Sequence, residues 1–161
     1  MNIRRGTVEE LIELWGYKDK NKLSDTARFF IEHIQNETAH FWTMEQNGKC
    51  FGELYVFFKL DDQDFADGDE KAYLCAFRIA EEYRHQGLGS TLIKSVMDTL
   101  KQQGIKKVTI GVDETEDANY RLYKRLGFDN KIKDSYIDPC NVDGKRNPKK
   151  CDCFWLLSKD L

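Results

Sequence analysis

The chain has 161 residues, of which 40% are hydrophobic and 33% are charged. A domain of this size buries about 70% of its unfolded surface, so we expect one soluble domain over 1–161 that needs no disulfide or metal to fold. The net charge of −3 argues against nucleic acid as a partner, because binding to a phosphate backbone normally needs a basic surface.

The cysteines and the N-terminal residues point to a reducing compartment. There are 5 cysteines, an odd number, and no C-x-x-C pair. The N-terminus lacks the apolar core of a signal peptide, and no run approaches the roughly 20 apolar residues of a membrane span. We therefore expect a cytoplasmic protein with reduced thiols and no membrane partner. Cys151 and Cys153 have no histidine near them, so we expect no metal site.

The first part of the chain predicts a strand, two helices and a strand hairpin. Thr7 and Glu10 match the capping box that begins a helix, and Asn47-Gly48 is the strongest short hairpin signal. The expected elements are strands at 3–5, 40–45 and 50–58, and helices that begin at Thr7 and Ser24.

An acidic run at 61–70 follows these strands. Its simplest interpretation is a solvated connection between two antiparallel strands. The alternative is a functional one, in which the carboxylates attract a cationic acceptor substrate.

The central section is the most regular. A strand at 72–80 precedes an amphipathic helix at 88–100, which we expect to end near Gly104, and a strand follows at 108–112. Strand, helix and strand in this order imply a right-handed crossover and a parallel pair of strands.

The last part predicts a short helix that ends at Gly127, a strand that starts at Phe128, and a closing hairpin of 132–137 and 153–158 around a polar insertion at 139–150. The order is therefore β-α-α-β-β-β-α-β-α-β-β. It corresponds to an α/β fold with α+β layering, in which about four helices cover a mixed, mostly antiparallel sheet of about six or seven strands.

The segment from Tyr83 to Ser90 carries the chemistry. A glycine-rich turn between a strand and a helix presents backbone N–H groups at the positive end of the helix, which is a geometry that binds phosphate. A P-loop is excluded because its spacing and lysine are absent. A dinucleotide fingerprint is excluded because Leu92 stands where its third glycine belongs, and because several strands precede the turn.

Two motifs give this sequence a family resemblance. Arg84, Gly87 and Gly89 form R-x-x-G-x-G, and the later segment Leu122-Tyr123-x-x-x-Gly127-Phe128 follows in the right order. Together they resemble the coenzyme A-binding and C-terminal signatures of the GNAT superfamily, the Gcn5-related N-acetyltransferases. The resemblance covers nearly the whole chain and implies the GNAT fold, with acetyl-CoA as the acyl donor.

The resemblance also implies roles for particular residues. Backbone N–H groups from Gln86 to Ser90 would hold the pyrophosphate of coenzyme A, and the strand at 77–79 would run beside its pantetheine arm. The cofactor residues expected in this way are Phe77, Arg78, Ile79, Arg84, His85, Gln86, Gly87, Leu88, Gly89, Ser90, Asn119 and Tyr123.

The catalytic residues expected are Tyr123 and Glu53. Tyr123 matches the tyrosine that commonly protonates the departing thiolate in this family, while its alternative role is to pack in the core. A primary amine is almost wholly protonated at neutral pH, so a base must take its proton. Glu53 is one candidate, Glu81 and Glu82 are others, and Tyr73 and Cys75 are candidates for lining a water path.

The sequence departs from the family at two places. Glu116 stands where many members have an asparagine seven residues before the tyrosine, and Asn119 is near but out of register. Ala80-Glu81-Glu82 replaces a proline that many members carry between the strand and the turn, which affects the rigidity of the loop more than its chemistry.

The sequence thus predicts an acetyl-CoA-dependent N-acetyltransferase that moves an acetyl group to a primary amine by direct attack in a ternary complex. The alternative is a non-catalytic acyl-CoA-binding sensor on the same fold. The acidic run and the polar insertion favour a small cationic amine over a protein as the acceptor. The length of the acyl group stays open, and so does a homodimer.

Overall fold

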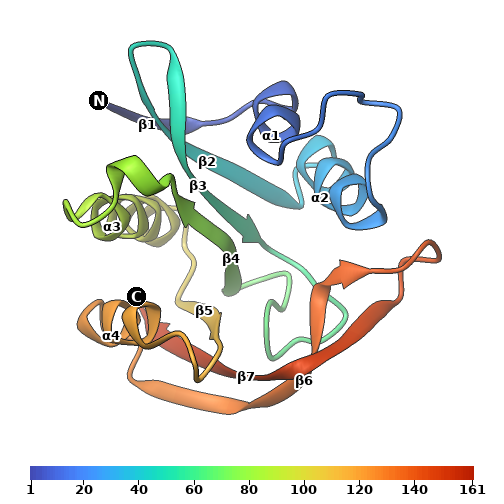
Figure 1. Ribbon diagram of the computed structural model, residues 1–161. Helices are drawn as coiled ribbons and strands as arrows, with labels where there is room; N and C mark the ends of the chain where they lie inside the picture. The colour runs from blue at the N-terminus through green and yellow to red at the C-terminus, as the bar shows by residue number, and fades with distance from the viewer.

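The computed structural model describes residues 1–161 and shows one curved sheet with helices on both faces (Figure 1). The sheet has 7 strands in the order β1-β2-β3-β4-β5-β7-β6. The strands are β1 (Asn2–Arg5), β2 (Ala39–Gln46), β3 (Lys49–Phe57), β4 (Lys71–Ile79), β5 (Lys107–Val112), β6 (Asn130–Val142) and β7 (Pro148–Asp160). The helices are α1 (Val8–Leu14), α2 (Asp25–Gln35), α3 (Leu88–Gln102) and α4 (Asp117–Arg125), with a 3₁₀ turn η1 (Glu81–Tyr83) before α3. The predicted element order and fold class are confirmed.

The sequence signals that begin the first two helices act as expected. The Thr7 side chain accepts a hydrogen bond from the backbone N–H of Glu10, and the Glu10 carboxylate accepts one from the backbone N–H of Thr7. Ser24 caps α2 by accepting from Ala27. These caps satisfy N–H groups that a helix start leaves free.

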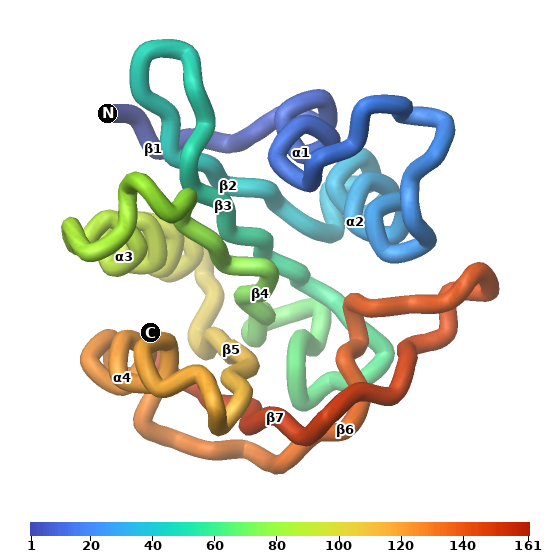
Figure 2. The backbone as a smooth tube through the Cα atoms, viewed as in Figure 1, coloured from blue at the N-terminus to red at the C-terminus, as the bar shows by residue number.

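The core is divided into two apolar clusters by the sheet. Leu92, Ile93 and Tyr123 belong to the cluster under α3 and α4, whereas Phe30 and Tyr55 belong to the cluster under α1 and α2. The two pairs of helices therefore cover opposite faces of the sheet, as the backbone trace shows (Figure 2). None of the helices is both long and apolar enough to cross a membrane.

β4 and β5 are paired over only part of their length. They are parallel, as predicted, from Lys71–Lys107 to Leu74–Ile110, and no pairing follows beyond Leu74. On its other side β4 has a bulge opposite β3, where Ala76 adopts a φ of 50°. A bulge bends its strand and re-aims the side chains after it. The backbone of β4 beyond Leu74 is consequently left without a partner on the β5 side.

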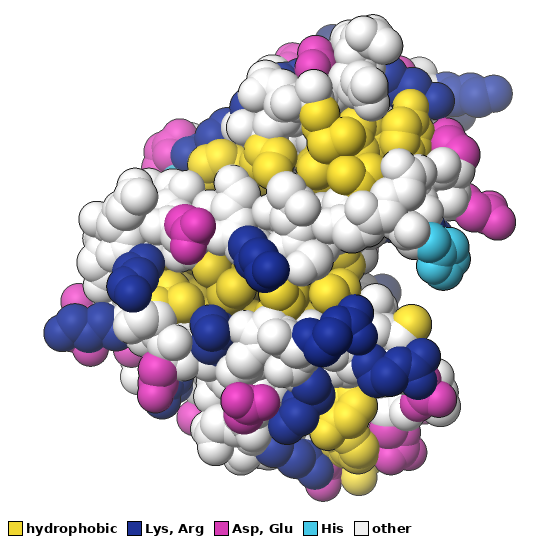
Figure 3. Space-filling model, turned by 90° about the vertical axis from the view of Figure 1, so that its left-hand side faces the viewer, with side chains coloured by type: hydrophobic (Ala, Val, Ile, Leu, Met, Phe, Trp, Pro, Cys, Tyr) yellow, Lys and Arg dark blue, Asp and Glu magenta, His cyan; other side chains and the backbone are white.

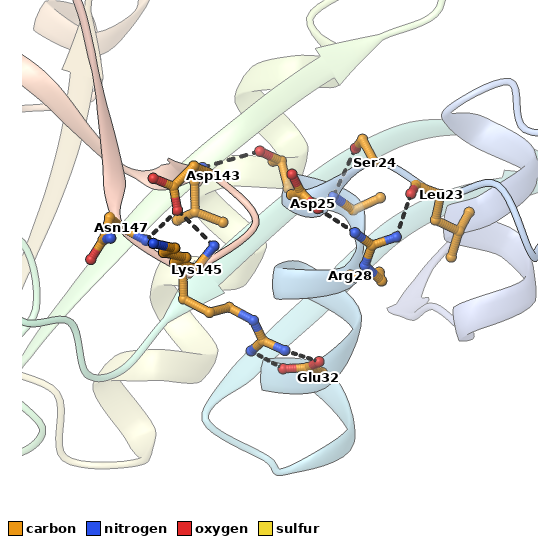
Figure 4. Close-up of polar contacts among 12 residues, drawn as sticks. Leu23, Ser24, Asp25, Arg28, Glu32, Asp143, Lys145 and Asn147 are labelled. Carbon is orange, nitrogen blue, oxygen red and sulfur yellow. Dashed lines mark hydrogen bonds and ion pairs between the residues drawn. The ribbon is translucent and has the colours of Figure 1, made fainter.

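The last hairpin is longer than the sequence pattern predicted. β6 begins at Asn130 rather than Phe128, and most of the expected insertion at 139–150 belongs to the two strands. Its polar residues lie on an arm that extends to α2, where Thr26 donates to the side chain of Asn141 at 2.9 Å and Arg146 pairs with Glu32 (Figure 4). An exposed arm needs no alternating apolar face, so the strand pattern was not visible in the sequence.

The acidic run forms an ordered connection between β3 and β4. The Asp67 carboxylate accepts hydrogen bonds from three consecutive backbone N–H groups, those of residues 69–71. Asp62 and Asp64 both bind the ammonium of Lys133, at 2.7 and 3.0 Å. Two carboxylates of the acidic run thus share one lysine, and a third holds the backbone of the connection in place.

Candidate active site

The turn before α3 presents a run of unused backbone donors. His85 and Gly87 both have positive φ, 64° and 77°, and Gly87 is the N-cap of α3. The backbone N–H groups from His85 to Ser90 donate to no acceptor in the protein, since the first intrahelical bond is from Thr91 to Gly87. Such donors at the start of a 15-residue helix form an anion site with the helix dipole behind it.

Two contacts hold this turn against the sheet. The Nε of Arg84 donates to the carbonyl of Ile79 at 2.8 Å, and the ring of Tyr83 stacks on Phe51 of β3 with centroids 4.1 Å apart. The turn is thereby fixed to the end of β4, directly beside the part of that strand that has left β5.

A cavity of about 500 Å³ joins the turn to the end of β4 and to α4. Every predicted cofactor residue except Gln86 and Tyr123 lines it. It is also lined by residues that the motif comparison missed, namely Tyr83, Ala118, Leu122 and Arg125. Leu122 and Arg125 lie in the same segment as Tyr123, so the periodicity of that helix was the signal that could have placed them on the cavity side.

The cavity is electrostatically suited to an anion. Arg78, Arg84 and Arg125 line it together with His85, and none of its lining residues carries a carboxylate. On the face of the molecule that includes α3 and α4, lysine and arginine side chains gather in the lower half of the view, with acidic side chains among them (Figure 3). The chain as a whole has a net charge of −3, so this positive lining is a local property of the site.

Tyr123 lies beneath the cavity rather than in its wall. Its side chain packs in the core under α4, with ring centroids 6.4 Å from Phe77 and 6.1 Å from Phe128. The residue is only 4% exposed. Its hydroxyl makes no hydrogen bond within the protein, but it is not fully enclosed. Burial raises the pKa of Tyr123, which keeps the phenol protonated.

Glu53 is buried in a dense hydrogen-bond network on the other face of the sheet. Its Oε1 accepts from Trp15 at 2.9 Å and from the Tyr55 hydroxyl at 3.1 Å. Its Oε2 accepts from the Nε and Nη2 of Arg78 at 3.0 and 2.9 Å. These four donors occupy the roughly four lone-pair sites of a carboxylate. Glu53 contributes to a recess of about 400 Å³ that also includes Ala76 at the bulge of β4.

The other candidate residues are distributed around these two sites. Asn119 lines the cofactor cavity, where its amide donates to Glu116 at 2.8 Å. Glu81 and Glu82 are exposed on η1. Tyr73 and Cys75 both point into the cluster under α1 and α2, on the face opposite the cofactor cavity. No group of three or more His, Cys, Asp or Glu side chains is arranged to hold a metal ion.

A larger cavity, of about 680 Å³, is separate from this region. It lies between α2, the connection after β3, and β6, and it is lined by residues such as Phe29, Leu60 and Tyr136. Arg146, which is one of its lining residues, pairs with Glu32 of α2 (Figure 4). It contacts neither the turn before α3 nor the unpaired end of β4.

The sheet thus splays beside an anion-binding helix start. Residues 7–128 match the model of the acetyltransferase (GNAT) family. The chain belongs to this family, which confirms the resemblance drawn from the two sequence motifs. No finding supports the non-catalytic alternative.

Individual relatives agree with this assignment. The probable N-acetyltransferase camello of Xenopus laevis is 24% identical over 117 residues, which cover 73% of this chain and 51% of that protein. The putative ribosomal protein bS18-alanine N-acetyltransferase of Bacillus subtilis is 27% identical over 100 residues, 62% of this chain and 60% of that protein. The chain thus spans between half and three fifths of the length of these two relatives.

A solved structure shows the same fold. A GNAT family acetyltransferase from Elizabethkingia anophelis, with acetyl-CoA bound, superposes with a TM-score of 0.60 and 20% identity, and the match covers 99% of this chain and 97% of that one.

Proposed function

We propose that this protein transfers the acetyl group of acetyl-CoA to a primary amine by direct attack in a ternary complex. The observation that carries the proposal is the run of unused N–H groups from His85 to Ser90, which opens on a cavity lined by arginines and free of carboxylates. A pyrophosphate fits this arrangement because the amides and the helix dipole compensate its charge without paired lysines. The acetyl-CoA bound to the Elizabethkingia anophelis relative is consistent with the same donor here.

The unpaired end of β4 supports a place for the rest of the donor. Beyond Leu74 the strand has backbone groups free on the β5 side, and Phe77 to Ile79 line the same cavity as the turn. The amide-containing pantetheine arm can bond to such an edge as an added strand does. The thioester would then lie near the bulge at Ala76, beyond the last pairing of β4 with β5.

The reaction moves one acyl group and one proton. The amine nitrogen attacks the thioester carbonyl, the C–N bond forms as the C–S bond breaks, the amine loses a proton and the sulfur gains one. We assign Tyr123 to the departing sulfur as a hydrogen-bond donor, because its hydroxyl has no partner in the protein, is not fully enclosed and stays protonated. We assign Glu53 a positioning role toward Trp15 and Arg78, because its oxygens are already occupied by donors.

A pair of variants at Gly87 tests the donor site. A Cβ at this position meets no atom within 4 Å, and asparagine and aspartate both tolerate positive φ. Gly87→Asp places a carboxylate among the free amides, whereas Gly87→Asn has the same shape without the charge. We expect calorimetry to show that Gly87→Asp weakens acetyl-CoA binding about 10-fold or more relative to Gly87→Asn.

Two results would contradict the proposal. Equal acetyl-CoA affinity in the two Gly87 variants would mean that the pyrophosphate lies elsewhere. Tight binding of acetyl-CoA without release of free thiol in the presence of any primary amine would favour the sensor over the enzyme.

A further inference from the structure

A second recess, of about 380 Å³, opens where β5 ends. It differs from the cofactor cavity in charge, because four carboxylates and no lysine or arginine are among its lining residues. These residues are Tyr73, Gly111, Val112, Asp113, Glu116, Asp138, Cys151, Asp152 and Phe154. We call it the acidic recess.

The hydroxyl of Tyr73 is an unpartnered polar group in the wall of the acidic recess. Tyr73 is only 5% exposed, and its hydroxyl has no hydrogen-bond partner although it is not fully enclosed. Gly111 leaves the space beside it open, since a Cβ there would lie 3.4 Å from that hydroxyl oxygen and 3.0 Å from the ring of Phe154. A buried hydroxyl normally has a partner, so this one is available to a ligand.

The acidic recess lies at the end of β5, and its two aromatic residues face the side of the sheet opposite the cofactor cavity. Tyr73 and Phe154 belong to the cluster under α1 and α2, whereas Phe77 and Tyr123 belong to the cluster under α3 and α4. The two sides meet where β4 separates from β5, just beyond Leu74. A molecule in the acidic recess can therefore approach a thioester in that opening from the side opposite the cofactor.

The carboxylates of the acidic recess are incompletely compensated. Asp113 accepts from Thr115, Glu116 from Asn119, and Asp138 from the backbone of Cys140, while Asp152 is exposed and has no partner. Burial raises the pKa of Asp138, and no cationic side chain of the recess offsets this. A bound ammonium would stabilise these charges.

The spacing of these groups favours an extended organic cation over a metal ion. No three of the acidic side chains are arranged to share a metal. The aromatic rings of Tyr73 and Phe154 also line the acidic recess. Their apolar faces suit a methylene chain, and aromatic rings also attract ammonium groups. One ammonium can stay charged among the carboxylates while a second amino group loses its proton and attacks.

We propose that the acidic recess binds the acceptor substrate and that this acceptor is a diamine, whose non-reacting ammonium is held by Asp138 and Asp152. The inference rests on the proposed function, since it names the acceptor of that reaction. It replaces the acidic run at 61–70 as the source of selectivity for a cationic amine.

The test compares two amines that differ only in the second charge. Thiol release at saturating acetyl-CoA is measured with diaminobutane and with butylamine. We expect kcat/KM to be about 10-fold or more higher for diaminobutane, because a hydrogen bond to a charged group contributes about 1.5–3 kcal/mol, or roughly 10- to 150-fold. Asp152→Asn and Asp138→Asn should lower kcat/KM for diaminobutane by about that factor and leave butylamine nearly unchanged.

Asp61→Asn is the matched control, because it removes one exposed carboxylate from the acidic run and leaves the acidic recess intact. It should behave as the wild type with both amines. Equal kcat/KM for the two amines, or a loss in Asp61→Asn as large as that in Asp152→Asn, would overturn the inference.

Failure of the proposed function is distinguishable from failure of this inference. If neither amine releases thiol, calorimetric titration of diaminobutane into the complex with coenzyme A tests the acidic recess alone. Binding that is lost in Asp152→Asn and retained in Asp61→Asn would support the recess. Absent binding, or binding that is the same for both variants, would overturn it.

Discussion

Gly89 and Phe77 are packed so closely that no side chain fits between them. A Cβ built on Gly89 would lie 2.7 Å from the Cζ of the Phe77 ring. This contact brings the first turn of α3 against the end of β4 and sets the width of the cofactor cavity between them. The second glycine of the motif is therefore required by the protein's own packing, whereas Gly87 is favoured by its φ of 77°.

Gly89→Ala tests this packing through stability. Alanine normally favours a helix over glycine by about 1 kcal/mol. Here the added methyl group must displace the ring of Phe77, so we expect a net loss of about 1–3 kcal/mol in the free energy of unfolding. Urea denaturation measures the change.

Phe77→Leu supplies the control for that experiment. In the Phe77→Leu background the methyl group meets a smaller side chain, so Gly89→Ala should cost less there than in the wild type, and the double-mutant cycle should give a coupling energy of about 0.5–3 kcal/mol. A stabilising Gly89→Ala in the wild-type background would show that the two elements can separate freely.

Most of the fold could be predicted from local signals. The capping box at Thr7, the Asn47-Gly48 hairpin and the strand–helix–strand spacing each depend on neighbours in sequence. The length of β6 and β7 could not be predicted, because the arm from Pro139 to Lys150 is polar and extends along α2. Its strand structure comes from pairing between its own two halves, which a pattern of burial does not reveal.

The candidate site was likewise predictable only in part from the sequence. The turn with Gly87 and Gly89 was predictable because its chemistry depends on consecutive backbone groups. The partners of Glu53 were not, since Trp15 comes from the end of α1 and Arg78 from β4 beyond the bulge. The acidic recess likewise contains residues from β4, β5, β6 and β7. Their spacing in the sequence does not predict that they lie together.

Tyr123→Phe tests the assignment at the departing sulfur. The change removes only a hydroxyl that bonds to nothing in the protein, so stability and acetyl-CoA affinity should be nearly unchanged. We expect kcat to fall about 100-fold, as for loss of a donor to developing negative charge. Because burial raises the pKa of this phenol, the wild-type rate should also not decline through its ionisation up to about pH 10.

Tyr120→Phe is the matched control for the Tyr123 experiment. Tyr120 lies on the same helix and packs against Trp155 with ring centroids 5.5 Å apart. Its hydroxyl has no part in the proposed reaction, so its loss should leave kcat unchanged. Similar rates in the two variants would remove Tyr123 from the chemistry and leave it as a core residue.

Glu10 connects the N-terminal strand to α1 and β3. Its carboxylate accepts from both terminal nitrogens of Arg4 at 2.9 and 2.7 Å and from the Cys50 thiol at 3.0 Å, in addition to its bond in the capping box. The hydrogen bonds from Arg4, followed by that from Cys50, hold the pKa of Glu10 well below its usual range. A carboxyl group of this kind binds fewer protons in the folded state than in the unfolded state.

Stability should therefore depend on pH through Glu10. Its contribution is complete above the unfolded pKa of about 4.3 and is lost as the pH falls toward the lowered folded pKa. We expect Glu10→Gln to reduce the free energy of unfolding by about 1–3 kcal/mol at neutral pH, and we expect this difference from the wild type to shrink at about pH 3. Glu9 is an exposed neighbour whose side chain makes no hydrogen bond or ion pair, so Glu9→Gln should change little at either pH. A deficit in Glu10→Gln that is the same at both pH values would mean that its charge contributes nothing, and that the shape of the cap alone stabilises the start of α1.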